Sequence, residues 1–423
     1  MLKPEIQAAY IAILNEELVP ATGCTEPIAV AYAAAKLRQV LGAQPERVRA
    51  EISGNIIKNV KSVVVPNTGG LKGIRAAIAV GIVAGEADRE LEVISSVPAG
   101  RHEEIAAYME RTLMELVCPD TPRMLDIRLT GWAGGHSAVV HIANNHSNIV
   151  CIEKDGERLL EKPLENSSES GLTDKSILNL RDILDFAGTV ELSRVSGLLE
   201  RQIQYNSAIA EEGLRHDWGA NIGSTLLKTY GDDVRVEAKA WAAAGSDARM
   251  SGCEMPVVIN SGSGNQGITS SLPVVRYAKH LGATQEQLYR ALLVSDLVTI
   301  YQKAGIGRLS AYCGAVSAGV GAGAGIAYLQ GADYDAIAHT IINAVAILSG
   351  TICDGAKPSC AAKIAASVDA GLLGYQMYLS GRNFQGGDGI VGQDVGETVA
   401  NVGVLAKAGM RSTDRTILQI MTQ

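Results

Sequence analysis

The sequence predicts an α+β protein: a large, mainly helical domain rich in glycine and alanine, and a smaller α+β domain of short strands. Short β-branched stretches separated by turn signals are concentrated between residues 46 and 160. Beyond residue 172 the apolar residues recur with helical spacing. Aromatic residues make up only 4% of the chain against 46 glycines, so small side chains must fill much of the interior between closely packed helices. We expect the smaller domain over 46–171, inserted between 1–45 and 172–423, which together form the helical domain.

Two helices are predicted at the N-terminus. Apolar residues at helical spacing indicate the first over residues 5–18. A loop at 20–23 precedes the second, over 25–41, because Pro27 suits the first turn of a helix and Gly42 suits the position after its last turn. Both helices are expected to pack with the helical domain.

Short strands are predicted over residues 48–54, 91–97, 124–130, 138–143 and 149–153. Helices over 73–85 and 102–117 are expected between them. The pairs Asn144-Asn145 and Asp155-Gly156 are typical of hairpin turns. The polar stretch 165–171 is interpreted as a linker between the two domains.

The rest of the chain predicts helices over residues 174–187, 190–213, 218–229, 234–250, 266–281, 284–300, 311–329, 333–349, 361–380 and 394–409. The stretch 311–330 carries no charge, so a membrane span has to be considered. Glycine, alanine and serine dominate it in place of leucine, isoleucine and phenylalanine, which makes its transfer into a bilayer weakly favourable. A buried helix is the better interpretation.

The composition limits the classes of function. A net charge of −8 argues against nucleic acid as the main partner, since nucleic-acid binding needs a basic face. The N-terminal stretch carries acidic residues and lacks the pattern of a signal peptide, so a cytoplasmic protein is expected. Seven widely spread cysteines do not predict a disulfide framework. In a reducing cytosol they serve in packing, as a reactive thiol or in a metal site.

Three cysteines lie at predicted junctions between helices and loops. Cys313 begins a glycine- and alanine-rich helix, and Cys353 and Cys360 lie in a loop with Asp354 and Lys357. Such a loop can bend several thiolates toward one point, and helix N-termini favour the thiolate. The spacing matches neither a ferredoxin run nor a zinc finger, so buried structural cysteines remain the alternative to a metal site.

A fourth cysteine, Cys24, directly precedes the helix start at Thr25-Glu26-Pro27. A thiol at a helix N-terminus is expected to have a lowered pKa. The functional interpretation is a reactive thiol or a fourth ligand. The alternative is a small residue that lets the chain enter the helix.

The segment 261–267 matches the pattern G-x-G-x-x-G of a dinucleotide site. A helical pattern containing Pro273 follows it in place of a βαβ unit, so the match is weak. A glycine-rich turn that binds a small anion, such as a substrate carboxylate, is the better interpretation, with a plain tight turn as the alternative. The candidate substrate-binding residues here are Ser261, Ser263, Asn265 and Gln266.

Two further segments, 53–60 and 65–74, are dense in asparagine, lysine and glycine. They could bind the amino and carboxylate groups of a zwitterion, or carry solvated and capping side chains. The candidates are Asn55, Lys58, Asn59, Asn67 and Arg75.

His136 follows the paired glycines Gly134-Gly135, which would let it approach a substrate closely and exchange protons near neutral pH. A satisfied structural histidine is the alternative. His141, on the following strand, is expected to be structural.

Together these motifs resemble the L-cysteine desulfidase family, and more distantly the catalytic part of bacterial iron–sulfur serine dehydratases. The resemblance rests on residues 21–27, 53–60, 65–74, 131–137, 261–267, 313–315 and 352–360. It implies a [4Fe–4S] cluster held by Cys313, Cys353 and Cys360, with one iron open, and a catalytic or substrate-facing role for Cys24.

The resemblance further implies a lyase that eliminates sulfide from L-cysteine without net redox change and yields pyruvate, ammonia and hydrogen sulfide, a reaction of cysteine catabolism. The open iron would act as a Lewis acid on the sulfur while a base removes the α-proton. Cys24 as thiolate, His136 and Lys58 are the candidate bases, and the sequence does not choose among them.

Three alternatives stand beside this hypothesis. The same site could act on L-serine and release water. The chain could be a non-catalytic protein that binds a small metabolite, or, least favoured, a membrane channel or transporter. The expected partner is a small amino-acid substrate, with no nucleic acid and no membrane, and a homodimer is the candidate assembly.

Overall fold

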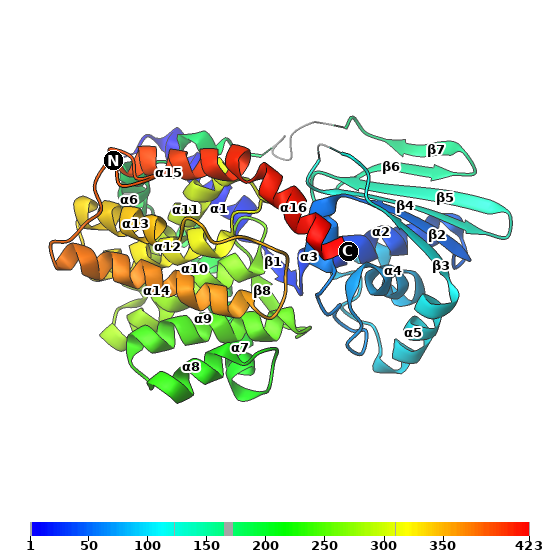
Figure 1. Cartoon of the computed structure of the whole chain (residues 1–423), viewed down its shortest axis with the longest axis horizontal. Helices are drawn as coiled ribbons and strands as arrows, with labels where there is room; N and C mark the ends of the chain where they lie inside the picture. The colour runs from blue at the N-terminus through cyan, green and yellow to red at the C-terminus, as the bar shows by residue number, and fades with distance from the viewer. Residues whose placement is uncertain (1, 122, 165–171, 309, 423) are drawn as a thin grey trace.

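The computed structural model describes residues 2–121, 123–164, 172–308 and 310–422. It has a mainly helical part and a part built on a six-stranded sheet, which lie side by side (Figure 1). Each part has a large hydrophobic core of its own. The predicted α+β fold with a large helical region is therefore confirmed. The predicted linker at 165–171 lies outside the described residues.

The six-stranded sheet has the strand order β3-β2-β4-β5-β6-β7. The strands are β2 (Arg47–Ile52), β3 (Leu113–Val117), β4 (Asp126–Ala133), β5 (His136–Ala143), β6 (Ile149–Lys154) and β7 (Glu157–Glu161). Neighbouring strands are antiparallel except β2 and β3, which are parallel and joined by a helical crossover. The hairpin predicted at Asp155-Gly156 is confirmed, and both residues have positive φ, as a type I′ turn requires.

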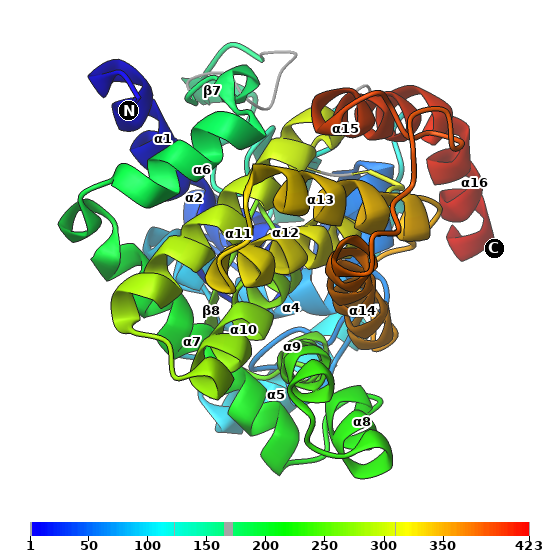
Figure 2. The ribbon, with the colours of Figure 1, turned by 90° about the vertical axis from the view of Figure 1, so that its left-hand side faces the viewer.

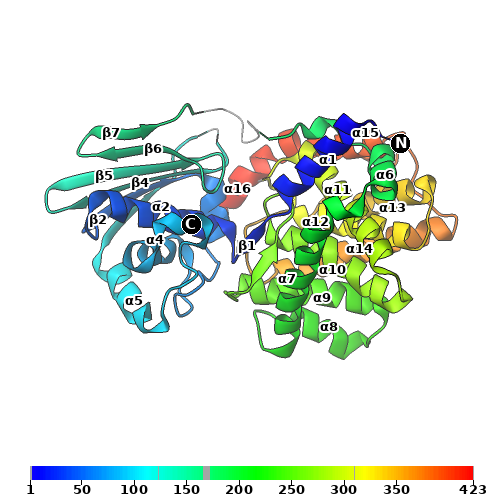
Figure 3. The same ribbon diagram turned by 180° about the vertical axis from the view of Figure 1, so that it is seen from behind.

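One face of the sheet packs on helices and the other faces outward. The covering helices are α2 (Thr25–Leu41), α4 (Gly73–Ala84) and α5 (His102–Arg111), which lie below the strands in Figure 3. Side chains along β2 alternate, so that Val48, Ala50 and Ile52 are buried while Arg49 and Glu51 are not. The outward face therefore carries charged side chains.

The helical part is arranged around one buried helix. Its helices are α1 (Pro4–Glu17), α6 (Leu180–Thr189), α7 (Ser196–Arg215), α8 (Ile222–Tyr230), α9 (Val234–Met250), α10 (Gly264–Leu281), α11 (Gln285–Ile306), α12 (Gly314–Leu329), α13 (Tyr334–Leu348), α14 (Cys360–Leu379), α15 (Val395–Val404) and α16 (Arg411–Thr422). Figure 2 shows α12 enclosed by its neighbours, and its residues 315–327 are all buried. The buried helix predicted from the uncharged stretch is confirmed. Within the described ranges, no helix is long and apolar enough to cross a membrane.

Glycines bring α12 and α14 into close contact. A Cβ at Gly323 would lie 2.7 Å from the carbonyl oxygen of Gly371, closer than a carbon can approach. Gly323→Ala is therefore expected to lower the free energy of unfolding by about 1–3 kcal/mol through overpacking. Gly197→Ala, in open space on α7, is expected to raise it by up to about 1 kcal/mol, because alanine favours helix. Denaturant midpoints measure both changes, and shifts of equal sign would contradict the packing argument.

Several predicted elements differ from the structure. Residues 91–97, predicted as a strand, fall at the end of a 3₁₀ helix (Ala87–Glu92) and in turns. The helix predicted over 102–117 ends at Arg111, and β3 follows, because residues 113–117 pair with β2. The sequence reading missed the short helix α3 (Gly54–Val60), strand β7 and helix α16. The helix predicted to 409 is α-helical only to Val404 and ends in a π-helical turn.

The division of the chain also differs from the prediction at α2. Its apolar side chains, including Ile28, Leu37 and Leu41, belong to the core under the sheet. Placing residues 25–41 in the helical part was therefore wrong, because a local pattern shows that a helix has an apolar face but not which partner covers it. At the other end of the chain, α16 leaves the helical part and packs against α3 (Figure 1).

Candidate active site

The predicted cysteines meet at a cavity between the two parts of the molecule. The cavity has a volume of about 110 Å³ and includes Cys24, Cys313, Cys353 and Cys360 in its wall. The sheet part contributes the start of α2 and helix α3, and the helical part contributes residues of α9, α11 and the starts of α10, α12 and α14. Segments far apart in the sequence thus form one small site.

Backbone pairing brings two of the cysteines together. The N–H of Cys353 donates to the carbonyl oxygen of Ala311 at 2.6 Å, and the N–H of Cys313 donates to that of Thr351 at 3.1 Å. These bonds form a short antiparallel bridge between the segments before α12 and before α14. Cys360 opens α14 and faces the same cavity. The loop residues predicted to converge do line one cavity.

Burial keeps Cys313 and Cys360 protonated in the absence of a metal. Burial and, second, the neighbouring Cys353 together raise the pKa of Cys313 to about 12. Burial also raises the pKa of Cys360, with Cys353 again adding to the shift. Lys363 and Lys357 lie beside these thiols, and both pair with Asp354. Binding a metal would release protons from these thiols, because the thiolate is the ligand.

Thiolates are the ligands that iron–sulfur clusters take, and three cysteines line this cavity. Within the described residues, no three histidine, cysteine or acidic side chains are grouped so that they could hold one metal ion. Around a cluster each thiolate binds a different iron, so the sulfurs stand farther apart than the ligands of one ion. Three thiols on one cavity, with two lysines nearby to offset negative charge, suit that arrangement.

Cys24 does not have the lowered pKa that its position before a helix predicts. Burial raises its pKa well above the ordinary value, and the carboxylate of Glu26 raises it further. The Cys24 thiol donates to Glu26 Oε2 at 3.0 Å, and Asn59 Nδ2 donates to Glu26 Oε1 at 3.1 Å. Cys24 is therefore a protonated hydrogen-bond donor in this structure, and its predicted action as a thiolate base has no electrostatic support.

This arrangement makes a prediction for metal-free protein. Glu26→Gln removes the carboxylate beside the thiol, so the pKa of Cys24 should fall and its alkylation by iodoacetamide at pH 8 should become faster. Peptide mass spectrometry measures the rate, with the exposed Cys118 as the internal reference. Unchanged rates at Cys24 would contradict the effect of Glu26.

Sequence reasoning missed two titratable groups near this site. His146, in the loop between β5 and β6, lies beside Glu26, and burial lowers its pKa against the opposing effect of that carboxylate. Lys303, on α11, lines the cavity, and burial lowers its pKa to about 8. No sequence motif marks either residue. A lysine on a helix and a histidine in a polar hairpin loop are usually exposed to solvent, so neither was expected at a buried site.

Buried polar atoms without hydrogen-bond partners are concentrated around the cavity. Within the described part of the chain, five residues in the cavity wall each have one such atom: Asn55 Oδ1, Arg249 Nε, Gln266 Oε1, Arg308 Nε and Tyr312 Oη. Each buried unpaired group costs about 1–3 kcal/mol, and native folds contain few of them. Their concentration at one cavity indicates a site for a polar ligand.

The glycine-rich segment forms a tight turn before α10. Ser261 and Gly262 both have positive φ, and Asn260 and Ser263 pair across the turn. The strand before it, β8 (Pro256–Val258), pairs antiparallel with β1 (Pro20–Thr22), so the segment is not part of a βαβ dinucleotide unit. Of the predicted binding residues, Ser263, Asn265 and Gln266 line the cavity, while Ser261 is buried and donates to Asn260 Oδ1.

Helix α3 carries the predicted residues Asn55, Lys58 and Asn59 into the cavity wall. The Lys58 ammonium is almost fully buried and pairs with Asp414 of α16. The structure thus places Lys58 at the site, but engaged in an ion pair.

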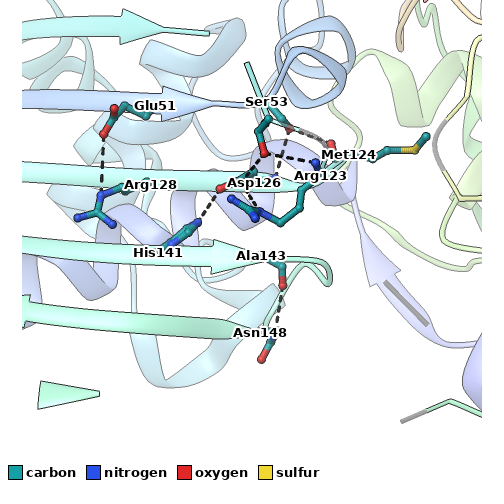
Figure 4. Close-up of polar contacts among 10 residues, drawn as sticks. Glu51, Ser53, Arg123, Met124, Asp126, Arg128, His141, Ala143 and Asn148 are labelled. Carbon is teal, nitrogen blue, oxygen red and sulfur yellow. Dashed lines mark hydrogen bonds and ion pairs between the residues drawn. The ribbon is translucent and has the colours of Figure 1, made fainter. Parts of the chain in front are cut away.

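A polar network anchors the start of α3 to the sheet (Figure 4). Ser53 Oγ donates to the carbonyl oxygen of Met124 at 2.8 Å, and Ser53 N–H donates to that of Asp126 at 2.9 Å. His141 Nε2 lies 2.6 Å from Asp126 Oδ1, and both side chains are buried. His141 therefore has the structural position that the sequence predicts, and the network fixes where α3 presents its side chains.

Three other predicted residues lie away from the cavity. His136 is exposed near the tip of the β4–β5 hairpin, where its Nδ1 lies 2.8 Å from Asp155 Oδ2. Asn67 donates to the carbonyl oxygen of Ile94, and Arg75 donates to that of Met109. The structure gives these side chains local partners and does not bring them to the site.

Comparison with known proteins relates the chain to one enzyme family. The family model described as serine dehydratase alpha chain matches residues 88–419. A UPF0597 protein of Desulfitobacterium hafniense is 57% identical over 412 residues, 97% of this chain and 96% of the relative. A UPF0597 protein of Treponema denticola is 48% identical over 418 residues, 97% of each chain. One from Lachnoclostridium phytofermentans is 52% identical over 411 residues, 97% of this chain and 98% of the relative.

Proposed function

The chain belongs to the serine dehydratase alpha chain family, and on that premise we propose that it is a lyase that eliminates sulfide from L-cysteine. The overall reaction would convert L-cysteine and water to pyruvate, ammonia and hydrogen sulfide. The family match confirms the predicted similarity to serine dehydratases. The observation that supports this proposal most is the presence of Cys313, Cys353 and Cys360 around one small cavity rich in unpaired polar groups.

A [4Fe–4S] cluster is the cofactor that we propose for this site. Cys313, Cys353 and Cys360 would hold it. When bound, it would supply a Lewis acid that makes the sulfur of the substrate a better leaving group.

Among the groups in the cavity wall, Lys303 has the properties of the base. A pKa of about 8 leaves a useful fraction of neutral amine near neutral pH. Cys24 is held as a neutral thiol, Lys58 is paired with Asp414, and His136 lies away from the cavity. We therefore assign removal of the α-proton to Lys303. Elimination then gives aminoacrylate, which becomes an imine and hydrolyses to pyruvate and ammonia.

The other polar groups would position the substrate. Asn55 Oδ1 and Gln266 Oε1 are buried without partners in the described ranges and can accept from an ammonium group. Cys24 lies in the same wall with its single S–H donated to Glu26, so it would shape the cavity without donating to the substrate. These assignments use groups that the fold already places around the cavity.

A second candidate function is supported by the family itself, whose model is that of a serine dehydratase chain. The same geometry could remove the α-proton of L-serine and release water. The two functions share every residue named above, so the difference between them lies in the leaving group alone.

Anaerobic reconstitution with iron and sulfide, followed by parallel assays of sulfide and pyruvate, tests the proposal. We expect L-cysteine to yield sulfide and pyruvate in equal amounts, and removal of iron by a chelator to abolish both. Pyruvate from L-serine at a much higher kcat/KM than from L-cysteine would instead establish the dehydratase. An iron-free protein with no turnover of either amino acid would overturn both.

A further inference from the structure

Two arginines of the cavity wall, the buried Arg249 and the partly buried Arg308, have no assigned role in this reaction. We infer that Arg249 and Arg308 bind the α-carboxylate of the ligand, so that the site accepts free amino acids and rejects amines of the same side chain. This inference rests on the proposed function for the identity of the ligand, although its binding test does not depend on turnover.

Arg249 is a buried cation held by neutral groups. Its side chain comes from α9, only 3% of the residue is exposed, and it lines the cavity. Nη2 donates to the carbonyl oxygen of Gly23 at 2.9 Å, and Nη1 donates to Asn265 Oδ1 at 3.2 Å. Nε has no hydrogen-bond partner among the described residues. The guanidinium is thus fixed in position with its Nε–H unused.

A buried carboxylate, that of Glu17, fixes the position of Arg308. Its Nη2 donates to Glu17 Oε1 at 2.6 Å, and the same oxygen lies 3.1 Å from Lys175 Nζ. Glu17 is 2% exposed, so this cluster is shielded from solvent. As in Arg249, the Nε of Arg308 is buried and unpaired within the described part of the chain.

Gly262, in the turn before α10, and Gly264, at the start of α10, let the two guanidinium groups pack closely against the backbone. A Cβ at Gly264 would lie 2.3 Å from Arg249 Nε, and a Cβ at Gly262 would lie 3.2 Å from Arg308 Nη1. A side chain at position 264 would therefore collide with the guanidinium, and one at 262 would crowd it. The close packing of the arginines explains why glycine occupies positions 262 and 264. The weak match to a dinucleotide motif does not explain it.

The positive charges of the two arginines are not fully paired with carboxylates. Among the described residues that contact Arg308, the carboxylate of Glu17 is shared between Arg308 and Lys175, while Arg249 hydrogen-bonds only to neutral groups. Glu26 already accepts from Cys24, Thr25 and Asn59. A buried cation in excess is costly unless it is paired. A carboxylate on the ligand would supply the missing negative charge.

The chemistry of the two side chains selects a carboxylate. The guanidinium fork matches the two oxygens of a carboxylate and forms charge-assisted hydrogen bonds. The proposed function supplies the rest of the ligand, a small side chain with a leaving group on its β-carbon. The ligand class is therefore a small α-amino acid with its carboxylate free.

Calorimetric titration of metal-free, unmodified protein tests this inference without any need for turnover. L-Serine and L-cysteine are compared with ethanolamine and cysteamine, which lack only the carboxylate. We expect the amines to bind at least about 100-fold more weakly, the loss of charge-assisted hydrogen bonds to a buried guanidinium. Equal affinity of cysteine and cysteamine would overturn the inference.

The substitutions Arg308→Lys and Arg249→Lys keep the positive charge but remove the planar guanidinium group, which can donate to both oxygens of a carboxylate. In reconstituted protein each is expected to raise KM for L-cysteine by about 10- to 100-fold with a smaller effect on kcat, since substrate binding is what is lost. The matched control is Arg276→Lys, because Arg276 is a largely buried arginine that pairs with Glu237 and stacks on Trp241 away from the cavity. A KM that changes equally in the control would overturn the assignment.

The outcomes separate this inference from the proposed function. Sulfide release from cysteamine at the rate seen with L-cysteine would refute the carboxylate requirement and leave the lyase intact. Selective binding of amino acids over amines, with no turnover of either amino acid, would support the two arginines and refute the lyase. If Arg249→Lys does not fold, Arg308→Lys and the titration of unmodified protein still decide.

Discussion

Protein in which Cys353 is replaced by alanine is expected, after anaerobic reconstitution, to release sulfide from L-cysteine at least about 1000-fold more slowly than the unmodified chain. A metal Lewis acid contributes several kcal/mol to the transition state, and each 1.36 kcal/mol corresponds to about tenfold in rate. Cys353 is the thiol whose backbone pairs with the segment before α12, beside Cys313. Its loss should remove one of three anchors and lower the iron content in parallel.

The matched control is Cys151→Ala on strand β6. Cys151 is partly exposed on the sheet and does not line the cavity. Iron and acid-labile sulfide analyses, together with sulfide release, should be unchanged in this variant. Full iron content and full activity in Cys353→Ala would contradict the ligand assignment, and equal losses in both variants would indicate a general effect on folding.

The second large effect is expected at Lys303. Lys303→Met removes the proposed base while keeping a long apolar chain, and kcat is expected to fall by about 10²- to 10⁴-fold. A base must be neutral to act, and burial lowers the pKa of Lys303, so activity of the unmodified enzyme should rise with pH as Lys303 loses its proton and then level off. The variant should lose this rising limb. Rates from pH 6 to 9.5 measure both properties.

Stability separates this effect from a folding defect. The folded-state pKa of Lys303 lies below the ordinary value for lysine, so its contribution to stability is lost as pH falls toward 8. At pH 7 the buried ammonium is a cost, and Lys303→Met is expected to be at least as stable as the unmodified chain. Lys279→Met, on the exposed end of α10, serves as the control. A variant that keeps kcat and the rising limb would move the role of base to another residue.

Much of the fold could be predicted because local signals decide where helices begin and end. Pro27 and Gly42 correctly predicted where α2 begins and ends. The spacing of the apolar residues predicted both ends of α9 at the residues where the structure has them. Residues 113–117 were predicted as helix because their pairing with β2 involves residues more than 60 positions away. The packing of α2 under the sheet was missed for the same reason.

The candidate site was predictable where its residues are chemically unusual. The cysteines, asparagines and glycine turns drew attention by type and spacing, and most of them line the cavity. Arg249, Lys303 and Arg308 were missed because a cation in a helix or its flanking loop is normally solvated, and only the tertiary structure shows its burial. The prediction that Cys24 has a lowered pKa was wrong, because burial raises the pKa by more than the helix N-terminus lowers it.

The ion pair between Lys58 and Asp414 joins positions 356 residues apart. A ribosome adds about 5–20 residues per second, so roughly 20–80 s separate the start of synthesis from the emergence of Asp414. The wall that contains Lys58 therefore cannot close during most of translation. The docking of α16, the last helix of the described chain, is therefore among the final steps that complete this wall.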